Sequence, residues 1–203
     1  MTTSSSEAHL GLRERKKLKT RRAIQENALR LFREQGYDAT TVEQIAEAAE
    51  ISPSTFFRYF PSKEDVVLQD DYDPMIAELL LAQPAELEPV EAVRRTIVQL
   101  LRDLPAAERD GLYQRVRLAM DVPALRARQW DGVEDSARMI AGALAQRTGR
   151  PADDFELRTL SLALMGAQIS AIYHWVETGG TKDIAAVLDQ AIDVLARGGR
   201  IDR

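Results

Sequence analysis

Residues 40–67 read TTVEQIAEAAEISPSTFFRYFPSKEDVV, and within them residues 52–60 combine three Phe, a Tyr and an Arg with three hydroxyl side chains. Burying the hydroxyls and the Arg without partners would cost free energy, and exposing all three Phe would gain nothing. We therefore expect one face of this segment to lie in a hydrophobic core. The opposite face is expected to contact a partner.

The stretch contains start and stop signals for short helices. Thr41 with Gln44 three residues later is a capping-box pattern, and it predicts a helix of about two turns. Ser52 is the expected N-cap of the next helix, with Pro53 at its first position. That helix must end before Pro61, because the residue before a proline is disfavoured in the α conformation.

A longer helix is predicted before this stretch and another after it. Residues 18–35 carry one apolar stripe at helical spacing and stop at a glycine; its members are Ile24, Ala28, Leu31 and Phe32. Ser62 opens a helix predicted to run over 63–81, and Asp65 completes a second capping-box pattern. Two short helices joined by a tight turn and braced by a longer one indicate a helix-turn-helix.

The geometry of the 53–60 helix assigns its two faces. Phe56 and Phe60 lie four residues apart and are predicted to pack into the core. The other side is expected to present short hydroxyls, a guanidinium and a phenol, which suit phosphates and base edges in a major groove; these are Ser54, Thr55, Arg58 and Tyr59.

Residues 28–67 resemble the N-terminal DNA-binding domain of the TetR/AcrR transcriptional regulators, without gaps. The resemblance implies a homodimer whose third helices enter successive major grooves of a palindromic operator, and a C-terminal helical domain that dimerises and binds a small-molecule inducer. By position it implies DNA contacts from Thr41, Ser52, Pro53, Ser54, Thr55, Phe57, Arg58, Tyr59 and Lys63.

Two positions depart from the family pattern. Glu50 stands where the family most often has a glycine, so the turn must adopt a geometry open to other residues or carry mild strain. Phe57 stands where a tyrosine is common, which removes a hydroxyl that could bind phosphate.

Charge is unevenly distributed along the chain, whose net charge is −5. Residues 1–69 hold 11 Lys and Arg against 10 Asp and Glu, whereas residues 70–203 hold 16 against 22. Seven of the basic residues fall between 13 and 22, and we expect Arg21 and Arg22 to add DNA contacts. The predicted domains are a flexible basic arm over 1–17, a helix-turn-helix domain over 18–68, and a ligand-binding and dimerisation domain over 69–203.

The predicted fold is all-α with about nine helices. After residue 81, helices are expected over 89–104, 107–120, 123–147, 153–178 and 181–197, separated by Pro and Gly breakers. The helices 153–178 and 181–197 are apolar on two sides, so each needs two partners. A single large core is one explanation; the other is a homodimer through these two helices in a four-helix interface.

Large or adaptable side chains in this region are candidates for an apolar ligand cavity: Tyr113, Arg117, Met120, Trp130, Met139, Met165 and Tyr173. Arg117 interrupts an apolar run and, if partly buried, could bind an anionic head group. The C-terminal region loosely resembles regulators that sense acyl-CoA-like or other lipophilic molecules.

The residues argue against an enzyme. The chain has two His and no Cys, and it lacks a glycine-rich phosphate loop and a histidine pair at metal spacing. We expect no catalytic residue, metal or cofactor. No stretch suggests a signal peptide or a membrane span, so a cytoplasmic location is expected. The predicted function is a repressor released from its operator by a small molecule; the alternative is an architectural DNA-binding protein without an inducer.

Overall fold

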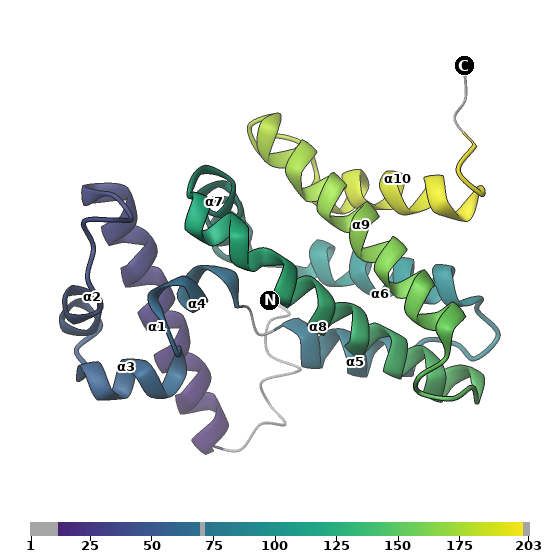
Figure 1. The fold of residues 1–203 in the computed structure, drawn as a ribbon, viewed down its shortest axis with the longest axis horizontal. Helices are drawn as coiled ribbons and strands as arrows, with labels where there is room; N and C mark the ends of the chain where they lie inside the picture. Colours follow the sequence, from purple (N-terminus) through teal and green to yellow (C-terminus); the bar gives the residue numbers. More distant parts are fainter. Residues whose placement is uncertain (1–11, 70–71, 201–203) are drawn as a thin grey trace. The chain divides into compact units, whose positions relative to one another are not determined.

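The computed structural model describes residues 12–69 and 72–200, and every regular element in these two ranges is an α-helix (Figure 1). There are ten helices in these ranges, and the predicted all-α class is confirmed. The described residues up to Gln69 form one compact unit together with Pro105–Ala127. Those from Tyr72 to Leu104 form a second unit with those from Arg128 onward. The first unit thus includes residues 105–127, which the sequence had placed in the C-terminal domain.

The first unit is built from α1 (Leu12–Gln35), α2 (Val42–Ala48), α3 (Pro53–Tyr59), α4 (Lys63–Leu68), α7 (Ala106–Asp121) and the first residues of α8 (Pro123–Thr148). The predicted start of α1 at residue 18 is wrong, because the helix already begins at Leu12. The added turns consist of Leu, Arg, Glu and Lys, all good helix formers. Residues 12–17 of the predicted arm are therefore helical, and its other residues, 1–11, lie outside the described residues.

The predicted caps of α2 and α3 are confirmed. The Gln44 amide N–H donates to Thr41 Oγ1 (3.3 Å), and the Thr41 N–H donates to Gln44 Oε1 (2.9 Å), which completes the capping box. At α3 the Thr55 N–H donates to Ser52 Oγ (3.1 Å), with Pro53 in the first turn. These bonds satisfy backbone donors that the helix leaves open at its N-terminus.

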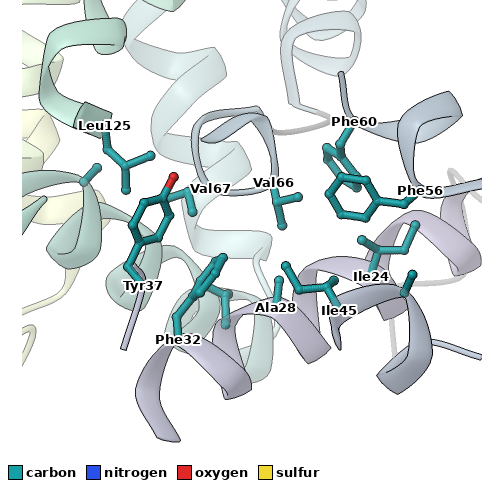
Figure 2. Packing of buried hydrophobic residues seen from close by; sticks show 13 residues of the cluster. Ile24, Ala28, Phe32, Tyr37, Ile45, Phe56, Phe60, Val66, Val67 and Leu125 are labelled. Carbon is teal, nitrogen blue, oxygen red and sulfur yellow. The ribbon is translucent and has the colours of Figure 1, made fainter. Parts of the chain in front are cut away.

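The core of the first unit gathers apolar side chains from α1, α2, α3 and α4 (Figure 2). Ile24, Ala28, Ile45, Phe56 and Phe60 are all fully buried there. Ala119 and Leu125 belong to the same buried cluster. This shared cluster explains why α7 and the start of α8 join the helix-turn-helix in one unit.

The single helix predicted over 63–81 is wrong, since α4 ends at Leu68 and Gln69 has an extended backbone with ψ 135°. The next helix, α5, spans Tyr72–Ala82 and has Pro74 in its first turn. A proline lacks the N–H that a helix interior needs and clashes with the preceding turn, so it is tolerated only near a helix start. Pro74 was the sequence signal for this break.

The second unit contains α5, α6 (Pro89–Asp103), the remainder of α8, α9 (Phe155–Glu177) and α10 (Ile184–Ala196). α10 packs against α9 and α6, and α6 packs against α5. Trp175 is almost fully buried, and its indole N–H donates to the Lys182 carbonyl (2.9 Å). α9 and α10 begin two to three residues later than predicted, because Asp154 and Asp183 are their N-caps.

A guanidinium fixes the end of α5 within this unit. Arg147 of α8 donates to the carbonyl oxygens of Leu80 (3.0 Å), Gln83 (2.7 Å) and Pro84 (2.7 Å). A cation is favourable there because helix C-terminal carbonyls carry partial negative charge. Among the described helices, none is both long enough and apolar enough to cross a membrane.

Candidate nucleic-acid interface

The turn between α2 and α3 is closed by two backbone hydrogen bonds. The Glu50 N–H donates to the Glu47 carbonyl (3.0 Å), and the Ile51 N–H donates to the Ala46 carbonyl (2.9 Å), a Schellman arrangement. Glu50 has φ +54°, in the left-handed region that favours glycine. Of the two alternatives for this turn, the structure therefore adopts the one in which Glu50 carries backbone strain.

α3 separates its side chains into a buried and an exposed face. Phe56 and Phe60 are fully buried, which confirms their predicted place in the core. Phe57 is 51% exposed, and Ser54 and Arg58 are exposed as well. An exposed Phe beside an exposed Arg has no role in the core, so this face is available to a partner.

The hydroxyls at the start of α3 form a connected group. Ser52 Oγ lies 2.9 Å from both Ser54 Oγ and Thr55 Oγ1. Near the other end of α3, the Arg58 guanidinium carbon lies 5.6 Å from the centroid of the half-buried Tyr59 ring. The exposed face therefore offers hydroxyls at one end and a cation beside an aromatic ring at the other.

Lys63, at the first position of α4, braces the loop between α1 and α2. Its Nζ donates to the carbonyl oxygens of Tyr37 (2.8 Å) and Thr40 (3.0 Å) and lies 4.2 Å from the Tyr37 ring centroid. Thr41, the exposed N-cap of α2, follows directly after that loop. A DNA contact from Lys63 stays a prediction, and the ammonium group has this second role in addition.

Arg21 and Arg22 have different surroundings. Arg21 donates to the Tyr59 carbonyl (2.9 Å) and to Gln69 Oε1 (3.3 Å). Arg22 Nη2 lies 3.4 Å from Glu108 Oε1 of α7. Both guanidinium groups are thus engaged within the first unit. From the sequence, Arg21 and Arg22 are only part of a basic cluster. Their partners could not be predicted, because they lie 38 to 86 residues away along the chain.

The predicted ligand residues fall in both units. Tyr113, Arg117 and Met120 lie on α7 in the first unit, and the other four, Trp130, Met139, Met165 and Tyr173, lie on α8 and α9 in the second. Arg117 is not partly buried: its side chain is 65% exposed, and its Nε lies 3.8 Å from Asp121 Oδ2.

The four residues of the second unit differ in exposure. Trp130 is 59% exposed, and its indole N–H donates to Glu134 (3.2 Å). Met165 is buried and Met139 half-buried. The Tyr173 hydroxyl donates to Gln129 Oε1 (2.6 Å), which joins α9 to α8.

The second unit also has an open surface pocket of about 600 Å³ that the sequence did not predict. Its lining mixes guanidinium groups, carboxylates and amides, and consists of Gln83, Pro84, Glu91, Arg94, Arg95, Val98, Gln99, Arg102, Asp103 and Asp189. None of the predicted ligand residues lines it. The three acidic residues offset the three arginines, so the pocket has no excess charge that would select an anion.

Two family models match the chain. Residues 24–69 match the model described as bacterial regulatory proteins, tetR family. Residues 87–200 match the MftR C-terminal domain of TetR regulators. The first match covers the second half of α1 and all of α2 to α4, and the second covers more than half of the whole chain.

The similar proteins of known name are transcriptional regulators, in agreement with both family models. The transcriptional regulator TcmR of Streptomyces glaucescens is 38% identical over 160 residues, 75% of this chain and 71% of its own. The putative mycofactocin biosynthesis regulator MftR of Mycobacterium tuberculosis is 26% identical over 91% of this chain and 93% of its own. Among solved structures, Thermus thermophilus FadR, a TetR family repressor in complex with lauroyl-CoA, is 28% identical with a TM-score of 0.56, covering 90% of this chain and 96% of that one. The chain belongs to the TetR family of transcriptional regulators, with an N-terminal helix-turn-helix DNA-binding domain.

Proposed function

We propose that α3 reads a palindromic operator in the major groove and that the protein is a repressor released from this operator by a small molecule. The observation that carries the proposal is the division of α3 into a face anchored by Phe56 and Phe60 and an exposed face with Ser54, Phe57 and Arg58. A recognition helix needs this combination, because its base-reading side chains must project from a rigid support.

The test is selection of a preferred site from random duplex DNA, followed by footprinting and affinity measurement. Arg58→Ala is expected to weaken binding to the selected site by about 1–3 kcal/mol at matched salt. Arg33→Ala, which removes an exposed arginine of α1 from the same unit, is the matched control. Unchanged affinity for Arg58→Ala would remove Arg58 from the reading face.

The footprint also decides between a regulator and the alternative, an architectural DNA-binding protein. A discrete protected palindrome supports a regulator. Uniform protection along the duplex, without a preferred site, supports an architectural protein.

We propose an acyl-CoA-like ligand for the second unit. The support is the complex of the FadR relative with lauroyl-CoA, together with Met139, Met165 and Tyr173, whose apolar and adaptable side chains suit an acyl chain. A ligand of this kind releases the operator only if it binds the DNA-free arrangement better, and a tenfold preference gives about 1.4 kcal/mol of bias per site.

Calorimetry with lauroyl-CoA tests this ligand class, with free CoA and lauric acid as matched controls. We expect lauroyl-CoA to bind more tightly than either half and to lower operator occupancy. Equal, weak binding of all three compounds would exclude acyl-CoA esters as the ligand.

We propose that the homodimer forms through α9 and α10. On α9 an exposed stripe at helical spacing includes Phe155 (80% exposed), Leu162 (43% exposed) and Gly166. In the described part of the chain, apart from the two neighbouring residues and the helix's own backbone, no heavy atom lies within 4 Å of where a Cβ on Gly166 would stand. An apolar stripe with a small residue suits close approach of a second copy of the same helix.

A further inference from the structure

Arg21 touches the ends of two helices that are separate in the sequence. Its Nη1 donates to the Tyr59 carbonyl oxygen (2.9 Å), and its Nη2 donates to Gln69 Oε1 (3.3 Å). Its guanidinium carbon also lies 4.1 Å from the centroid of the Phe60 ring. Tyr59 is the last residue of α3, and Gln69 is the C-cap of α4. One side chain of α1 therefore holds the C-terminal ends of both helices.

Gln69 is held from other directions as well. Gln25 of α1 donates from Nε2 to the carbonyl oxygens of Gln69 (3.0 Å) and Val66 (3.3 Å). Arg115 of α7 donates to the same Gln69 carbonyl (3.5 Å). The end of α4 is thus a fixed point of the first unit, and Arg21 connects α3 to it.

The chemistry of the contact requires an arginine. The carbonyls at a helix C-terminus have no partner within the helix and carry partial negative charge, so a cation there is stabilising. A planar guanidinium can stack on the Phe60 ring and still donate from its edge to two acceptors. A lysine ammonium can form the charge interaction but does not provide this flat fork.

We infer that Arg21 is a positioning residue for the recognition helix, which it holds at its C-terminal end, and that it does not act as a phosphate contact. The inference rests on the proposed role of α3 in reading DNA. The two roles differ in their consequences, because phosphate contacts strengthen binding to every duplex whereas the position of α3 matters only for reading bases.

Hydrogen exchange without DNA tests the contact directly. In Arg21→Met, the backbone amides of residues 58–60 are expected to exchange about tenfold faster than in the unaltered chain, because the end of α3 loses a charge-assisted hydrogen bond. The Phe60 amide, which donates to the Phe56 carbonyl (2.9 Å), is the most informative of them. Arg22→Met, which removes the neighbouring arginine and its Glu108 partner contact, should leave these amides unchanged. Equal exchange in Arg21→Met and the unaltered chain would overturn the inference.

DNA binding at several salt concentrations tests the consequence. Arg21→Met is expected to reduce the preference for the selected site over random duplex by about tenfold, with an unchanged slope of log affinity against log salt. Equal weakening on both duplexes, with a slope smaller by about 0.9, identifies a phosphate contact and overturns the inference.

Arg21→Lys keeps the positive charge and decides the matter if Arg21→Met fails to fold. This variant should prefer the selected site over random duplex nearly as weakly as Arg21→Met does. A site preference equal to that of the unaltered chain would show that the planar guanidinium is not needed. If the unaltered chain prefers no site at all, the proposed function fails. The exchange measurement still decides whether Arg21 holds α3.

Discussion

Arg94 of α6 binds Asp189 of α10 through two parallel hydrogen bonds, from Nε to Oδ1 (2.7 Å) and from Nη2 to Oδ2 (3.0 Å). These bonds are the main reason that the pKa of Asp189 lies below its ordinary value. The same contact raises the pKa of Arg94. Because the residues lie 95 positions apart, this bidentate pair fixes α10 against α6.

Removing this pair should destabilise the second unit modestly. Asp189→Asn is expected to lower the free energy of unfolding by about 1 kcal/mol, since the Asp189 side chain is 37% exposed and solvent screens the charges. The matched control is Asp135→Asn, which breaks an ion pair with Arg138 whose side chains are 72% and 73% exposed. Urea unfolding near pH 7 should show a change within about 0.5 kcal/mol for the control.

The same pair predicts a direction for the pH dependence. A carboxylate whose pKa is depressed by folding contributes its stability fully above its unfolded pKa, about 3.9, and loses it as the pH falls through the folded value. The stability difference between the unaltered chain and Asp189→Asn should therefore be constant from about pH 7 to 5 and shrink below about pH 4. A difference that grows on acidification would contradict this assignment.

Glu50→Gly should stabilise the first unit. An L-residue in the left-handed region costs about 1–2 kcal/mol, and glycine loses about 0.5–1 kcal/mol more backbone entropy on folding, so a net gain of about 0.5–1 kcal/mol is expected. Thermal unfolding of Glu50→Gly and Glu50→Ala separates the backbone effect from the charge. Alanine should give no comparable gain, because its Cβ keeps the strain.

Phe56 and Phe57 are adjacent residues with opposite surroundings. Phe56→Ala should cost about 3–5 kcal/mol of stability because its side chain is fully buried. Phe57→Ala, at a side chain that is 51% exposed, should change stability by less than about 1 kcal/mol and act mainly on DNA binding. Chemical denaturation and DNA affinity are measured for both variants. Together they distinguish a core residue that supports α3 from a residue that contacts DNA. A stable Phe56→Ala would show that α3 is rotated relative to this structure.

Leu162→Glu tests the proposed dimer. A charge on the exposed stripe of α9 should give monomers that retain their helices, because burying an unpaired carboxylate in an interface is strongly unfavourable. Leu81→Glu on α5 is the matched control, since Leu81 and Leu162 are both 43% exposed. Sedimentation should find monomers for the first variant and dimers for the second. Dimers in both cases would place the interface elsewhere.

Local sequence was enough to predict the helix-turn-helix. The caps at Thr41 and Ser52 and the spacing of Phe56 and Phe60 act between residues three or four positions apart, so their geometry follows from the helix itself. Pro74 was equally local, and the break before α5 was predictable from it. The ligand residues were less predictable, because a Trp or Arg in an amphipathic pattern can face either side; Trp130 and Arg117 proved to be exposed.

The sequence by itself determined the all-α class, the family and the two faces of α3, since these depend on periodicity, caps and short-range spacing. Tertiary structure decided that residues 105–127 join the first unit, that Arg21 binds the end of α3, and that Lys63 braces the loop before α2. Each of these depends on which groups meet after distant segments pack together. A basic side chain can donate to DNA, to a carboxylate or to a helix end, and only the folded chain brings one of these acceptors within hydrogen-bonding distance.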